Sequence, residues 1–88
     1  MDHNDITVII LLYRTPKKLL KNLVKYKDFK LLILDQSNDL TNSKILKNFL
    51  PRIQYYGLTE RNMGFANAQN FLIKKVKTKY FFSTQPDI

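Results

Sequence analysis

The feature that most constrains this chain is a β-branched and aliphatic run near its start, with one Thr in it: Ile6-Thr-Val-Ile-Ile-Leu-Leu-Tyr13. Apolar and polar side chains do not alternate in this run, so we expect both of its faces to be buried. A β-branched and aliphatic run of this kind is typical of a central strand in a parallel sheet that helices cover on both sides.

Helix-like and strand-like segments alternate after this run. Apolar residues at helical spacing predict three helices, and short apolar runs predict three more strands. Thr15 is expected to cap the first helix and Ser43 the second. The order β-α-β-α-β-α-β predicts an α/β fold with a parallel sheet, right-handed crossovers and helices on both faces. The helices are expected at 16–26, 43–50 and 65–76, and the strands at 31–35, 53–56 and from 80 onwards.

Length and composition exclude several classes of protein. The 88 residues allow one domain. Without Cys there is no disulfide framework, thiolate metal site or Cys nucleophile, and a single His excludes a His cluster.

The first apolar run is far shorter than the ~20 residues of a membrane-spanning helix. Acidic residues precede it where a signal peptide carries Lys or Arg. We therefore expect a cytoplasmic protein, with a peripheral position at the inner face of the membrane as the alternative.

The net charge of +8 leaves two interpretations open. It results from 15 Lys and Arg against 7 Asp and Glu. Such an excess suits an anionic partner such as a nucleotide, a nucleic acid or a membrane surface. A compositional bias toward Lys on solvated faces produces the same excess.

Polar residues follow each expected strand, where ligands bind in open parallel α/β sheets. Three of the seven acidic residues, Asp35, Asp39 and Asp87, lie at or just after the ends of strands. A carboxylate at such a place either binds the N–H and O–H donors of a ligand or caps a turn. Both readings stay open for Asp35.

Four segments together resemble a known family. The first two are Val8-Ile-Ile-Leu-Leu-Tyr-Arg-Thr-Pro16 and Leu32-Ile-Leu-Asp-Gln-Ser-Asn-Asp39. The third and most specific is Asn62-Met-Gly-Phe-Ala-Asn-Ala-Gln-Asn70, and the fourth is Phe81-Phe-Ser-Thr-Gln-Pro-Asp-Ile88. In this order they are similar to the N-terminal, nucleotide-binding half of family 2 glycosyltransferases with the GT-A fold. The rhamnosyltransferase-like branch is the most similar.

The resemblance implies a Rossmann-like sheet that binds a nucleoside-diphosphate sugar carrying UDP, dTDP or GDP. It places Thr15, Asp35, Asn62, Gly64 and Asn70 at the nucleotide. It also makes Asp87 a ligand of a divalent cation, Mg²⁺ or Mn²⁺, on the donor diphosphate. Relatives of this kind transfer a sugar to a glycan or another acceptor, as in polysaccharide assembly.

The chain departs from the family pattern in three respects. Gln85 stands where the family has Asp or Asn, and Arg14 stands where it often has Asn. The match covers about the first third of a typical enzyme, so residues 1–88 are expected to form one truncated donor-binding domain. The acceptor-binding half and the catalytic base are then absent, and we assign no catalytic residue.

Two alternatives to donor binding remain. A small basic module for nucleic acid would explain the charge, although the usual recognition motifs are lacking. A truncated chain without activity of its own would associate with itself through an exposed sheet edge, since an uncovered edge favours pairing.

Overall fold

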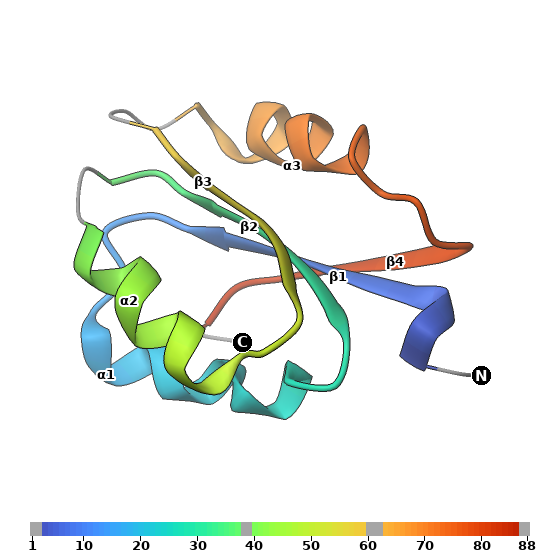
Figure 1. The fold of residues 1–88 in the computed structure, drawn as a ribbon. Helices are drawn as coiled ribbons and strands as arrows, with labels where there is room; N and C mark the ends of the chain where they lie inside the picture. The colour runs from blue at the N-terminus through green and yellow to red at the C-terminus, as the bar shows by residue number, and fades with distance from the viewer. Residues whose placement is uncertain (1–2, 38–39, 60–62, 87–88) are drawn as a thin grey trace.

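The computed structural model describes residues 3–37, 40–59 and 63–86. Its four strands form one parallel sheet in the order β3-β2-β1-β4 (Figure 1). The strands are β1 Ile6–Leu12, β2 Lys30–Asp35, β3 Ile53–Leu58 and β4 Tyr80–Thr84. The helical segments are η1 His3–Asp5, α1 Lys17–Leu20, η2 Lys21–Tyr26, α2 Leu40–Phe49 and α3 Phe65–Ile73.

The predicted fold class is confirmed. In Figure 1, α1 and α2 lie on one face of the sheet and α3 lies on the other. The chain adds β2 and β3 on one side of β1 and then returns to place β4 on the other side. Right-handed crossovers put the connecting helices on opposite faces when the direction of strand addition reverses, as it does here. The result is the Rossmann-like α/β arrangement of a GT-A N-terminal half.

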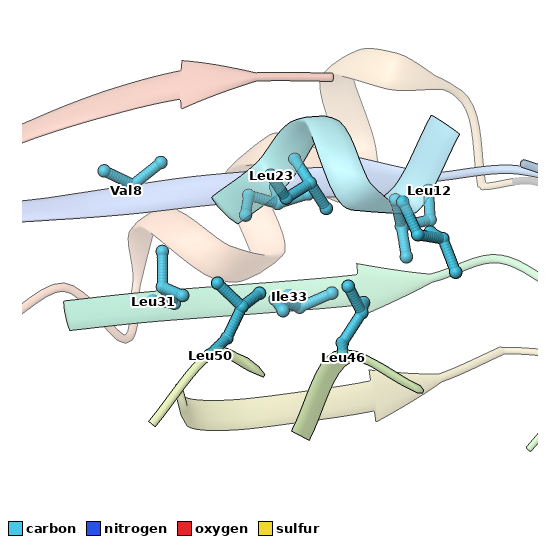
Figure 2. Packing of buried hydrophobic residues seen from close by; sticks show 9 residues of the cluster. Val8, Leu12, Leu23, Leu31, Ile33, Leu46 and Leu50 are labelled. Carbon is cyan, nitrogen blue, oxygen red and sulfur yellow. The ribbon is translucent and has the colours of Figure 1, made fainter. Parts of the chain in front are cut away.

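The first apolar run explains why β1 is central. Residues Val8 to Leu12 are all at most 5% exposed, because alternate side chains enter two different cores. Val8, Ile10 and Leu12 pack with α1, η2 and α2, as Figure 2 shows for part of this cluster. Ile9 and Leu11 instead pack with Ala68 and Leu72 of α3. A strand that is buried on both faces has little room for polar side chains, which explains the apolar run. Its one polar residue, Thr7, is buried and shares a hydrogen bond with Thr78.

Several predicted element boundaries were wrong. The segment after β1 has the expected extent, but its second half is the 3-10 helix η2. Thr15 does not cap α1: Pro16 is the N-cap, with an extended backbone (φ −59°, ψ 139°) and no side-chain cap. Ser43 lies inside α2, which begins at Leu40. β3 continues past Gly57, and α3 ends at Ile73 rather than at Val76.

Within residues 3–37, 40–59 and 63–86, no helix has both the length and the apolar character needed to cross a bilayer.

Candidate functional site

A cleft of about 320 Å³ opens at the carboxyl ends of β1, β2 and β4. It lies between the segment leading into α1 and the start of α3, and its floor comes from the end of β1. The described residues that line it are Leu11, Leu12, Tyr13, Thr15, Pro16, Leu19, Gln36, Phe65, Gln85 and Pro86.

The strand order explains why the cleft forms here. β2 and β4 lie on opposite sides of β1, so the connections that leave β1 and β3 diverge to opposite faces of the sheet. The point at which the strand order reverses is called a switch point. It leaves a crevice outside the carboxyl ends of the strands, and α/β proteins bind their ligands there. The cleft therefore occupies the place where this topology favours a binding site.

Gln36 is the most firmly held polar group of the cleft. Its side chain is 5% exposed, and its Oε1 accepts a hydrogen bond of 2.7 Å from the backbone N–H of Met63. Its own backbone N–H donates to the carbonyl of Leu12 over 2.8 Å. These bonds join the ends of β1 and β2 to the segment before α3. The amide is thereby fixed, with its oxygen used within the chain.

Asp35, one residue earlier, faces the other side of the sheet. It is fully buried, and both of its carboxylate oxygens accept hydrogen bonds. Ser37 Oγ donates to Oδ1 over 2.6 Å, and Tyr56 OH donates to Oδ2 over 2.8 Å. Asn42 Nδ2 makes a longer contact of 3.4 Å with Oδ2. Asp35 does not line the cleft, and it links the loop after β2 to α2 and β3.

Asn42 carries the one buried side-chain atom that has no hydrogen-bond partner within the described ranges, its Oδ1. Reversing the amide group would be unfavourable, because Oδ1 would then face the carboxylate of Asp35. Buried polar groups are usually paired. The carboxylate therefore determines which way the amide points.

The other predicted nucleotide-binding residues lie at different distances from the cleft. Thr15 lines it. Gly64 precedes the lining residue Phe65 and has φ +82° and ψ 149°, a conformation that side chains rarely adopt. Asn70 is exposed on α3, on the side opposite the buried Ala68 and Leu72. Asn62, together with the predicted metal ligand Asp87, falls outside the described residues.

Sequence reasoning missed Tyr13 and Phe65 as lining residues, and it included Gln36 only as part of the polar segment 35–39 after the second strand. Tyr13 was assigned to the buried strand, but β1 ends at Leu12 and Tyr13 is 45% exposed. Phe65 was assigned to the buried stripe of α3, but it is 55% exposed. Tyr13 and Phe65 stand next to predicted loop residues in the sequence, and this position was the available sign that they line a site. Gln36 had the same signal, since it follows Asp35 directly.

The described lining residues do not by themselves fit a divalent cation. They offer hydroxyl and amide oxygens, including that of Gln85, but no carboxylate. Mg²⁺ in proteins typically uses one or two carboxylates together with phosphate oxygens. In the part of the chain that the structure describes, no three His, Cys, Asp or Glu side chains are grouped as metal ligands. A metal site here would depend on Asp87.

One comparison with known proteins agrees with this architecture. No curated protein and no solved structure matches the chain significantly. A family model described as "Glycosyl transferase family 2" matches residues 8–86, which include β2, β3, β4, all of β1 except its first two residues, and every described lining residue of the cleft. The chain therefore belongs to glycosyl transferase family 2.

Proposed function

We propose that the cleft binds the nucleotide part of a nucleoside-diphosphate sugar, the donor of a sugar transfer to a glycan or another acceptor. The observation that carries this proposal is the position of the cleft at the switch point of the sheet, within the segment that matches the family model. Polysaccharide assembly is the process we propose for that transfer, in the rhamnosyltransferase-like branch of the family.

The size and lining of the cleft support a nucleoside as the occupant. Small-molecule sites have volumes of about 300–1,000 Å³, and 320 Å³ is at the lower end of that range. Aromatic rings at Tyr13 and Phe65 and amide groups at Gln36 and Gln85 suit the faces and edges of a base. The described lining contains no carboxylate or His, and the role we propose for it is binding.

The remaining site residues stay predictions. Asp35 Oδ1 accepts one hydrogen bond, from Ser37, and a carboxylate oxygen can accept a second, so we propose Asp35 as a further acceptor for donors of the nucleoside. We propose Asn62 and Gly64 as the turn that brings backbone close to the ligand, and Asn70 as a contact from α3. We also propose Mg²⁺ or Mn²⁺ on the diphosphate, held through Asp87.

Donor binding is tested by titrating ¹⁵N-labelled protein with UDP, dTDP and GDP, with and without Mn²⁺. We expect amide shifts concentrated at Thr15, Gln36 and Phe65 for at least one nucleotide. Phe65→Ala should weaken that binding several-fold, because the lost ring covers the ligand; base–aromatic contacts contribute about 1–3 kcal/mol.

Phe81→Ala is the matched control. Phe81 has a similar exposure to Phe65, 45% against 55%, but lies on β4 outside the cleft lining. This variant should bind as the unaltered protein does. The proposal fails if none of the three nucleotides shifts the cleft amides. It also fails if a parallel titration with an oligonucleotide at low salt is the only one that produces shifts.

A further inference from the structure

We infer that Arg14 supplies the positive charge that binds the donor diphosphate at the mouth of the cleft. This inference rests on the proposed donor binding and adds the group that recognises the phosphates. Its first support is position, because Arg14 lies between Tyr13 and Thr15, which both line the cleft.

The backbone and side chain of Arg14 are both distinctive. Arg14 is the one residue other than glycine with a positive φ (49°) among those the structure describes. Left-handed backbone is unfavourable for an L-residue with a long side chain. Its guanidinium carbon lies 5.3 Å from the centre of the Tyr13 ring, within the range of a cation–π contact. The cation therefore lies against the ring of a residue that lines the cleft.

The charge of the cleft is the second support. The described residues that line it carry no charged side chain, so neither a cation nor a carboxylate acts on a ligand from within. A nucleoside diphosphate brings several negative charges that need a partner. An Arg guanidinium can bind phosphate oxygens in pairs, with charge-assisted hydrogen bonds that are stronger than neutral ones. Arg14 is exposed and so is accessible to such a ligand.

The test compares uridine, UMP and UDP as ligands, in the presence of EDTA so that no divalent cation contributes. Dissociation constants are measured by NMR titration for the unaltered protein, Arg14→Asn, Arg14→Lys and Lys18→Asn. Asn tolerates left-handed backbone, so Arg14→Asn removes the charge without added strain. Lys18 is an exposed cation four residues further on and outside the cleft lining, and it serves as the control for net charge.

We expect Arg14→Asn to weaken UDP binding by about tenfold, the scale of one charge-assisted hydrogen bond. Uridine binding should stay unchanged, Arg14→Lys should recover part of the loss, and Lys18→Asn should bind like the unaltered protein. The salt dependence of UDP binding should also decrease in Arg14→Asn, because one phosphate contact is lost.

Three results would overturn the inference. If Arg14→Asn binds UDP as tightly as the unaltered protein, Arg14 has no role at the phosphates while donor binding stands. If uridine and UDP weaken equally, Arg14 acts through the Tyr13 ring and not on the diphosphate. If the unaltered protein binds neither UDP nor uridine, and dTDP and GDP also fail, the proposed function falls together with the inference.

Discussion

Asp35 shows how one side chain can connect three elements. Its carboxylate accepts hydrogen bonds from Ser37, Asn42 and Tyr56, which belong to the loop after β2, to α2 and to β3. These hydrogen bonds hold the buried side chain, so its removal leaves their donors without an acceptor.

We expect Asp35→Ala to lower the free energy of unfolding by about 1–3 kcal/mol, the penalty for leaving buried donors unpaired. Asp28→Ala is the control, because Asp28 is exposed and should change stability by less than about 0.5 kcal/mol. Urea denaturation followed by circular dichroism measures both. Equal stability of the two variants would contradict the role of the Asp35 carboxylate in joining β2, α2 and β3.

At the scale of elements, the start of α3 depends on the backbone conformation of Gly64. Gly64 is the N-cap of this helix and makes no side-chain cap, and Asn67 Nδ2 donates to the carbonyl of Met63 across the same turn. A Cβ built on Gly64 would meet no atom within 4 Å. The requirement for glycine is therefore conformational and not steric.

Gly64→Ala should destabilise the protein by about 1–3 kcal/mol, the cost of a side chain in this backbone region. Ala66→Gly, a change of one methyl group in the first turn of α3, should cost at most about 1 kcal/mol. Thermal unfolding compares the two variants, and hydrogen exchange of the α3 amides should increase in Gly64→Ala. A loss no larger than that of Ala66→Gly would show that φ +82° is not needed.

The elements also show which local features sequence could predict. Periodic apolar residues determine the two helical faces: Leu46 of α2 and Leu50 directly after it are buried as expected, and so are Ala68 and Leu72 of α3. The helix starts were wrong at Thr15 and Ser43, because a hydroxyl residue near a helix is common and its use as a cap depends on the neighbouring backbone. In α2 the first turn begins earlier and buries Asn42 beside Asp35.

At the scale of the whole molecule, β4 forms one edge of the sheet and is poorly covered. Among the described strands it pairs with β1 alone, and Tyr80, Phe81 and Phe82 are 44–49% exposed. Phe82 contacts Tyr26 on one face, with ring centres 6.0 Å apart. Exposed apolar edges promote association, whereas a net charge of +8 opposes it.

We therefore expect the chain to associate with a second copy through β4 when salt screens its charge. Sedimentation velocity at low and high ionic strength should show association that rises with salt and protein concentration. Phe81→Lys should reduce it, while Leu40→Lys, on α2 and also exposed, should not. A monomer under all conditions, or equal effects of the two variants, would contradict association through this edge.

The sequence by itself determined the alternation of strands and helices, the burial of β1 on both faces, and the family. These features depend on local periodicity and on short motifs, which act over a few residues. Only the tertiary structure decided that β4 pairs with β1, from Ile6 opposite Tyr80 to Ile10 opposite Thr84, because such pairing joins segments far apart in the chain. That pairing brings Gln85 to the cleft beside Tyr13 and Thr15.

The tertiary structure also separated Asp35 from Gln36, since successive residues at a strand end point to opposite faces of the sheet. Asp35 is thereby buried against α2, and Gln36 faces the cleft.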